Sequence, residues 1–127
     1  MLPESGDIVW VELDPVLGTE QAGRRPALVL SDRAYHEISR RSVVCPITSR
    51  AKPWSFNVPL PEGLETRGVV LVDQIRTVDR EHRVFGVIEH VPDRVLLDVR
   101  GVLVALLGLD SVPIASGPSP SIPDASA

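Results

Sequence analysis

The sequence predicts a mainly β domain, folded as a small twisted barrel and closed by one long C-terminal helix. Short apolar or alternating runs recur along residues 8–88, separated by Gly, Pro, Asn, Asp and Ser, as the strands of a β domain do. One long stretch near the C-terminus instead has the period of a helix. The residues that share its apolar face are Val95, Leu96, Val99, Val102, Leu103 and Leu106.

The predicted strands follow one another along the chain. Residues 8–13 alternate imperfectly, as a strand buried mostly on one face does, and this pattern predicts that Trp10 lies in the core. The β-branched run 69–72 predicts a central strand, and residues 79–83 predict a polar turn. The predicted strands span residues 8–13, 27–30, 42–47, 55–58, 69–72, 75–78 and 84–88.

Two segments have helical signals. Residues 32–40 predict one or two helical turns, with Ser31 or Asp32 as the N-cap. The terminal helix is expected to be about 16 residues long. Pro92 is accepted in a first helical turn and Gly108 is a suitable C-cap.

The chain of 127 residues fits one domain, which we place at residues 1–110. Residues 111–127 are rich in Ser, Pro and Ala without periodicity, and they predict a disordered tail. No signal peptide and no apolar run long enough to span a bilayer occurs, so no membrane contact is expected. The lone Cys45 agrees with a cytoplasmic location and is predicted to pack in a strand rather than act as a nucleophile.

Charge is unevenly distributed along the chain. The net charge of −4 argues at first against nucleic acid as a partner. However, residues 1–23 hold five acidic residues and no base, whereas residues 24–83 hold eleven basic against seven acidic residues. A local basic groove on an acidic protein is therefore compatible with the sequence.

Residues 18–26, with the sequence GTEQAGRRP, connect two predicted strands. The glycines permit positive φ angles, and the guanidinium group of arginine presents a planar fork of donors that suits phosphate oxygens. The loop therefore indicates a phosphate site. The residues alone leave a second interpretation open, in which the arginines of a solvated hairpin loop pair with Glu20 or Asp14.

Metal and cofactor motifs are absent from the sequence. His36, His82 and His90 fall in three separate regions and are predicted to be surface or turn residues. No Cys/His spacing indicates zinc, no carboxylate pair indicates a two-metal site, and no Gly-rich nucleotide-binding pattern occurs. We expect no metal and no cofactor.

An ordered series of short motifs resembles the MazF/PemK family of toxin endoribonucleases. The resemblance covers about residues 5–108. The motifs are GDIVWV at 6–11, DP at 14–15, GTEQAG at 18–23, RP at 25–26, LS at 30–31, CPITS at 45–49 and GVVLVDQIR at 68–76. The resemblance to this family implies an SH3-like barrel of the MazF/PemK/CcdB type and a homodimer.

The resemblance also implies catalytic residues. The family has an essential Arg immediately before the Pro that matches Pro26, so this role passes to Arg25, while Arg24 is expected to be a solvated charge. Its catalytic Thr lies two residues after the Pro that matches Pro46, which assigns Thr48. From the residues alone, a threonine that bonds its own turn is the more common case, and the resemblance reverses that order.

Other motif residues are expected to bind the substrate. They are Thr19, Glu20 and Gln21 in the loop, Ser49 beside the catalytic Thr, and Gln74 and Arg76 in the Asp-Gln-x-Arg segment. Asp73 is predicted to be a structural acceptor. Trp54 and Phe56 could stack on bases, or they could be core or dimer contacts.

The function implied is that of a type II toxin, a metal-independent and sequence-specific endoribonuclease. Such an enzyme lets the 2′-OH of single-stranded RNA attack the adjacent phosphorus, which gives 2′,3′-cyclic phosphate and 5′-OH ends. A cognate, MazE-like antitoxin would cover the groove with an acidic extended segment. The alternatives are a CcdB-like toxin that poisons DNA gyrase without enzymatic activity, and an inactive member of the family.

Overall fold

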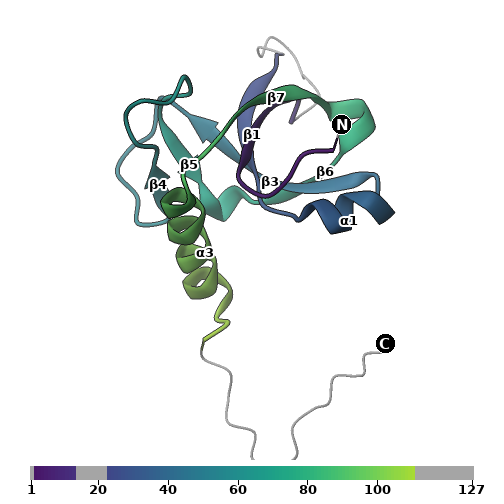
Figure 1. Cartoon of the computed structure of the whole chain (residues 1–127). Helices are drawn as coiled ribbons and strands as arrows, with labels where there is room; N and C mark the ends of the chain where they lie inside the picture. Colours follow the sequence, from purple (N-terminus) through teal and green to yellow (C-terminus); the bar gives the residue numbers. More distant parts are fainter. Residues whose placement is uncertain (1, 14–22, 111–127) are drawn as a thin grey trace, which may run out of the picture.

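The structure, a computed structural model, describes residues 2–13 and 23–110 (Figure 1). The predicted fold class is confirmed, and each predicted strand is present with ends displaced by no more than two residues. The strands are β1 Asp7–Val11, β2 Arg25–Val29, β3 Arg41–Thr48, β4 Asn57–Pro59, β5 Val69–Leu71, β6 Arg76–Asp79 and β7 Val84–His90. The helical elements are α1 Arg33–Ile38, the single 3-10 turn η1 Val72–Gln74, α2 Arg80–Arg83 and α3 Asp93–Leu107.

Within the described residues the strands form one antiparallel sheet in the order β4-β5-β3-β2-β1-β7. Strand β3 is long enough to serve three neighbours, because β6 pairs with its first half while β2 and β5 pair with its second half. The prediction that β5 is a central strand is confirmed, since it lies between β3 and β4. The sheet curves into an incomplete barrel, because no pairing between the described residues joins β4 to β7.

Two apolar clusters lie on opposite faces of β1. Ile8 belongs to the larger cluster, which includes Leu28, Cys45 and Val70 and is covered by Val95 and Val99 of α3. The second cluster is smaller. It consists of Val9, Val11, Leu13, Ala27, Val29, Val44 and Val78. Because both faces of the sheet are covered, its strands are almost continuously apolar, which explains why the alternation of residues 8–13 is imperfect.

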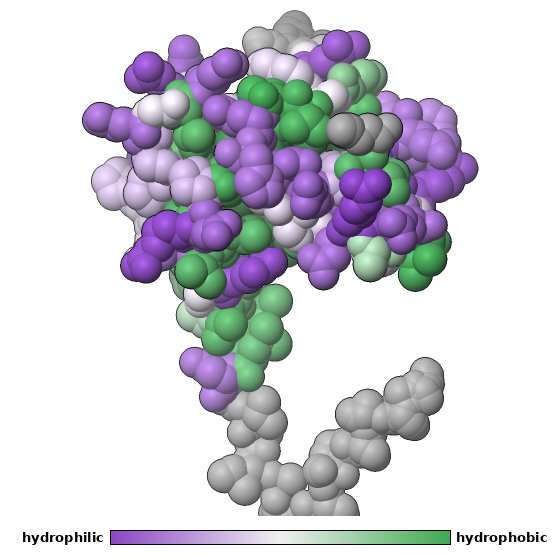
Figure 2. Space-filling view, viewed as in Figure 1, coloured by the Kyte–Doolittle hydropathy of each residue, from purple (hydrophilic) through white to green (hydrophobic). Residues whose placement is uncertain are grey.

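Helix α3 projects from the end of the molecule that carries β4 and β5, as Figure 1 shows. Pro92 is its N-cap rather than part of its first turn, and Gly108 is the predicted C-cap with a left-handed φ of 69°. Its outer side exposes Leu97 and Leu107, and Figure 2 shows the resulting apolar surface on the projecting helix. None of the helices in the described residues has the length and apolar character that crossing a bilayer requires.

Residues 79–83, predicted as a turn, contain the short helix α2. The Asp79 side chain accepts a hydrogen bond from the Glu81 backbone N–H at 3.0 Å, and this cap favours a helical turn over an open one. Asp32 is the N-cap of α1 by its backbone, but its side chain makes no capping hydrogen bond.

The prediction that His36 is a surface residue is wrong. His36 is buried on α1, its Nδ1 lies 2.7 Å from the carbonyl oxygen of Pro3, and its Nε2 lies 2.7 Å from Ser31 Oγ. Ser31 Oγ also accepts a hydrogen bond from the Val43 backbone N–H. The imidazole therefore ties the N-terminal segment to α1 and β3. His82 and His90 are exposed, as predicted.

Candidate active site

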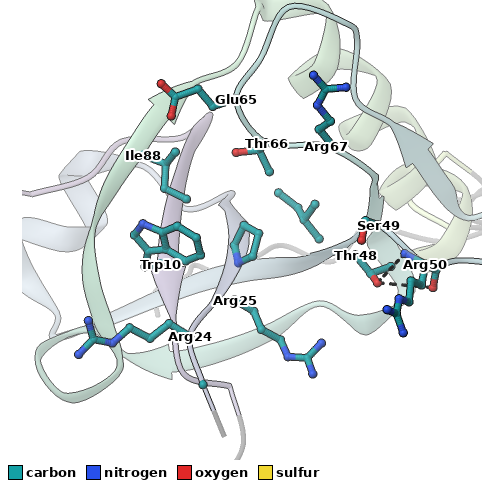
Figure 3. Close-up of a pocket in the computed structure, with 13 residues that line it drawn as sticks. Trp10, Arg24, Arg25, Thr48, Ser49, Arg50, Glu65, Thr66, Arg67 and Ile88 are labelled. Atoms are coloured by element: carbon teal, nitrogen blue, oxygen red, sulfur yellow. Dashed lines mark hydrogen bonds between the residues drawn. The ribbon is translucent and has the colours of Figure 1, made fainter. Parts of the chain in front are cut away.

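A groove of about 730 Å³ opens on the surface where β2 begins and β3 ends. Figure 3 shows its side chains, with Trp10 and Ile88 on one side and Thr48, Ser49 and Arg50 on the other. The described residues that line it are Trp10, Gly23, Arg24, Arg25, Pro26, Ile47, Thr48, Ser49, Arg50, Glu65, Thr66, Arg67 and Ile88.

The groove results from a parting of two strands. Strands β2 and β3 pair from Val29↔Val44 to Ala27↔Pro46. Beyond that point Arg25 and Pro26 pair with β1, whereas Ile47 and Thr48 pair with β5. Each strand therefore turns toward a different neighbour, and the space between their ends forms the groove.

The groove is strongly basic. Among the described residues, four arginines line it and Glu65 is the one acidic residue. This local charge contrasts with the net charge of −4 of the whole chain. The expected basic groove on an acidic protein is therefore present, and it is suited to the phosphates of a nucleic acid strand.

Arg25 is exposed at the first position of β2, opposite Val11 of β1. In Figure 3 its guanidinium group points toward the side of the groove that carries Thr48 and Arg50. Arg24 is exposed, as expected for a solvated charge, but its guanidinium group also has a partner. Its guanidinium carbon lies 3.9 Å from the centroid of the exposed Phe85 ring, which is the geometry of a cation–π contact.

Thr48 is the last residue of β3 and is partly buried. Its Oγ1 accepts a hydrogen bond from the Arg50 backbone N–H at 3.1 Å, so the threonine does bond its own turn. Among the described residues, the one acceptor of the hydroxyl proton is the carbonyl oxygen of Arg50 at 3.5 Å, at the outer limit of a hydrogen bond. The turn thus fixes the side chain and leaves its proton available to another acceptor.

A third wall of the groove comes from residues 65–67, which are held by Glu89 of β7. The Glu89 carboxylate accepts hydrogen bonds from the backbone N–H groups of Glu65 and Thr66 and from Thr66 Oγ1, at 3.0, 2.8 and 2.7 Å. Burial acts to raise the pKa of Glu89, but these three hydrogen bonds stabilise the anion and bring the pKa below its ordinary value.

The sequence prediction did not identify Trp10, Arg50 or Arg67 as residues of this groove. Arg50 directly follows the CPITS motif and Arg67 directly precedes the GVVLVDQIR motif. For both residues, an arginine directly adjacent to a family motif was the sequence signal that could have indicated a place in the groove. Trp10 gave no such signal, since it lies within an apolar strand.

The prediction that Trp10 lies in the core is wrong. Its side chain is 43% exposed and lines the groove. Trp10 shares a face of β1 with the buried Ile8, but it lies beyond the edge of the apolar cluster on that face. Its cross-strand neighbours are Pro26 and Gly86, and neither has a long side chain to cover an indole.

The other predicted substrate-binding residues are divided by the structure. Ser49 lines the groove, whereas Gln74 at the end of η1 and Arg76 at the start of β6 do not. Thr19, Glu20 and Gln21 lie outside the described residues, as do residues 111–127.

Trp54 and Phe56 pack on each other with ring centroids 5.4 Å apart, away from the groove. The Trp54 indole N–H donates a hydrogen bond to Asp73 Oδ2 at 2.9 Å, which confirms the prediction that Asp73 is a structural acceptor.

Cys45 is buried in β3, as predicted. Burial, with a smaller contribution from the negative charge of Asp73, raises the pKa of its thiol to about 12. The thiol therefore stays protonated at neutral pH and is not a nucleophile. In the described part of the chain, no group of three or more His, Cys, Asp or Glu side chains could hold a metal ion.

Residues 4–107 match a family described as the PemK-like, MazF-like toxin of type II toxin-antitoxin systems. The chain is 40% identical to the Endoribonuclease PemK of Escherichia coli over 108 residues, which cover 82% of this chain and 81% of that protein. It is 45% identical to the crystal structure of MazF from Deinococcus radiodurans, with a TM-score of 0.77 over 85% of this chain and 98% of the other.

A crystal structure of MazE-MazF from the same organism is also similar, at 44% identity and a TM-score of 0.79, covering 86% of this chain and 98% of the other. The family match spans most of the chain and includes both strands that form the groove. The chain therefore belongs to the PemK-like, MazF-like family of toxins of type II toxin–antitoxin systems.

Proposed function

We propose that this endoribonuclease toxin cleaves single-stranded RNA in the groove between Arg25 and Thr48, without a metal ion. One observation carries the proposal: an arginine and a threonine from two different strands line one basic groove that is open to solvent. The reaction requires that the enzyme bind a polyanion and stabilise a pentacoordinate phosphorus. The N–H donors of arginine can do both.

In the proposed reaction the ribose 2′-hydroxyl gives up its proton and its oxygen attacks the adjacent phosphorus, the bond from phosphorus to the 5′-oxygen breaks, and the leaving 5′-oxygen takes up a proton. The products are a 2′,3′-cyclic phosphate and a free 5′-OH. The nucleophile belongs to the substrate itself, so the enzyme's contribution is to align it and to stabilise negative charge.

Arg25 stabilises the phosphoryl oxygens in this mechanism. Its guanidinium group carries a permanent positive charge and two parallel N–H donors, and it lies exposed at the mouth of the groove. Thr48 donates its hydroxyl proton to a phosphoryl oxygen. The hydrogen bond from the Arg50 N–H orients the Thr48 oxygen and stays intact while the hydroxyl donates.

The substrate is single-stranded, because an unpaired base can leave the stack and enter the groove, whereas a paired base cannot. Ser49, beside Thr48, is the further binding residue that lines the groove. Five further residues remain proposed contacts of the RNA. Thr19, Glu20 and Gln21 lie outside the described residues, and Gln74 and Arg76 are described but do not line the groove. The cytoplasm is the proposed location of this activity.

The proposed partners are a cognate antitoxin and a second copy of the chain. An acidic, extended segment of a MazE-like antitoxin complements the four arginines of the groove. A homodimer would cover the exposed leucines of α3. Light scattering of the full chain tests the dimer, with a single monomeric mass as the contrary outcome.

The experiment that tests the function uses purified full chain and mixed-sequence single-stranded RNA in excess EDTA. We expect fragments that end in 2′,3′-cyclic phosphate and 5′-OH groups, identified by mass spectrometry. Cleavage that requires added Mg²⁺, or fragments with 3′-OH ends, would contradict the mechanism. The alternative of a CcdB-like gyrase poison is not supported, since the chain belongs to the PemK/MazF family.

A further inference from the structure

Trp10 is the largest apolar side chain in the groove, and the protein leaves it open to solvent. The indole is 43% exposed, although a tryptophan on a sheet normally finds a cover. No hydrogen bond joins its N–H to another described residue. Exposure of so large an aromatic surface in a concave, charged groove indicates a ligand that covers it.

The strands around Trp10 keep this surface open. Its partner on β2 is Pro26 and its partner on β7 is Gly86. Gly86 has a φ of 145°, and a Cβ atom built there would meet nothing within 4 Å. There is therefore free space beside the indole that no described side chain fills.

Charge and apolar surface in the groove are arranged as a nucleotide requires. Figure 3 shows the Trp10 ring beside Ile88, with the guanidinium group of Arg25 farther along the groove toward Thr48. A nucleotide likewise joins a charged phosphate to a flat, weakly polar base. A strand whose phosphate lies at Arg25 can thus rest a base on the indole.

The second tryptophan of the chain provides an internal comparison. Trp54 is 54% exposed, but its N–H is bonded to Asp73 and its ring packs on Phe56. It does not line the groove. Exposure alone therefore does not distinguish the two residues, whereas position in the basic groove does.

We propose that Trp10 is a stacking surface for one base of the RNA, at a nucleotide that flanks the scissile phosphate. This inference rests on the proposed function, because it assumes that RNA occupies the groove. Stacking accepts any base, so Trp10 contributes affinity and alignment of the strand rather than recognition of a particular base.

The first test follows the fluorescence of Trp10. In the full-chain variant Trp54→Phe, Trp10 is the single tryptophan. We expect its emission to be quenched by a mixed-sequence single-stranded DNA, which lacks the 2′-OH and cannot be cut. An abasic strand of the same length carries the same phosphates but no bases, and it should bind with little quenching. Equal quenching by both strands, or none by either while anisotropy reports binding, would overturn the inference.

The second test combines protein and substrate changes, starting from an RNA that the wild-type protein cuts. Removing one base at a time should lower kcat/KM at one position by roughly 5- to 150-fold, as the loss of one stacked base predicts. Trp10→Ala should lower kcat/KM on intact RNA by a similar factor. In this variant, removing the base at that position should cause no further loss of kcat/KM. Trp10→Phe should retain most of the activity, and Trp54→Phe all of it.

If removing each base lowers kcat/KM in Trp10→Ala by the same factors as in the wild type, the inference is overturned while the proposed function stays intact. If Trp10→Ala does not fold, the same comparison is made with Trp10→Leu, which keeps apolar bulk but cannot stack. A wild-type protein that cuts no RNA would contradict the proposed function, and the fluorescence test would still decide whether Trp10 stacks on bases.

Discussion

Arg25 and Thr48 occupy facing positions in the register that joins β2 to β3. Ala27 pairs with Pro46. Extending this antiparallel register by two residues on each strand places Arg25 opposite Thr48. The two strands part within those two residues, because β2 continues along β1 and β3 along β5. The side chains consequently face each other across a groove instead of touching.

Arg25→Ala should lower kcat/KM for RNA cleavage by roughly 100- to 1000-fold, the effect of removing one donor that stabilises transition-state charge. Because Arg25 is exposed, the free energy of unfolding should change by no more than about 0.5 kcal/mol. Single-turnover cleavage and urea unfolding measure the two quantities.

Arg24→Ala is the matched control, since Arg24 also lines the groove but its guanidinium group lies over Phe85. We expect weaker RNA binding and a shallower dependence of binding on salt concentration, with a much smaller loss of rate at saturating RNA. Equal losses of kcat in the two variants would mean that the groove acts through its total charge alone.

Thr48→Ala should lower kcat by roughly 10- to 1000-fold, because a neutral donor to the phosphoryl oxygen is lost. The variant also removes the acceptor of the Arg50 N–H, but water reaches this exposed turn and limits the loss of stability to about 1 kcal/mol. Thr48→Ser keeps the hydroxyl and should recover most of the activity.

Thr77→Ala is the control for Thr48→Ala, since Thr77 is an exposed threonine on β6 that does not line the groove. It should cleave RNA at the wild-type rate. A melting temperature that collapses in Thr48→Ala but not in Thr77→Ala would assign Thr48 a structural role instead.

Much of the fold and part of the candidate site could be predicted from the sequence. Strand positions follow from local apolar runs, and Gly108 ends α3 because a left-handed residue is required there. The meeting of Arg25 and Thr48 followed from a family resemblance. The register that brings them together depends on pairing between residues about 20 apart, which local patterns do not determine.

The errors at Trp10 and His36 have a common physical cause. Alternation indicates that Trp10 shares a face of β1 with Ile8, but it does not indicate where the apolar cluster on that face ends. His36 is buried because Pro3, 33 residues away, covers it and accepts from its ring. In both cases burial is decided by segments distant in the sequence.

Glu89→Gln should loosen residues 65–67 and change the dependence of stability on pH. In the wild-type protein the folded-state pKa of Glu89 lies below its ordinary value of 4.5. Its stabilising contribution is therefore complete above about that value and is lost as the pH falls through the folded-state pKa.

The Glu89→Gln variant lacks this titration. Its free energy of unfolding should be lower than that of the wild type at pH 7 by roughly 1–3 kcal/mol, and the difference should shrink on acidification. Glu62→Gln, an exposed change in the same loop, should run parallel to the wild type in urea unfolding from pH 3 to 7. A constant difference for Glu89→Gln across that range would show that the charge of Glu89 does not hold the loop.

Gly68→Ala should destabilise the protein and, at the same time, displace Thr48. Gly68 has a φ of 120°, and a Cβ atom there would lie 2.6 Å from the carbonyl carbon of Thr48 and closer still to its oxygen. Backbone strain of about 1–3 kcal/mol is then joined by an overlap with backbone atoms, which cannot rotate away as a side chain can. We expect the free energy of unfolding to fall by roughly 3 kcal/mol or more in total.

Gly63→Ala separates the two contributions to the Gly68→Ala effect. Gly63 has a similar φ of 101°, but its Cβ would meet nothing within 4 Å, so only the backbone strain should be felt. The Gly63 variant should therefore unfold at a higher temperature than the Gly68 variant and cleave RNA normally when folded. The Gly68 variant, assayed well below its melting temperature, should also lose kcat, because relief of the overlap moves Thr48. Equal melting temperatures in the two variants would mean that the close approach of Gly68 to Thr48 does not constrain the site.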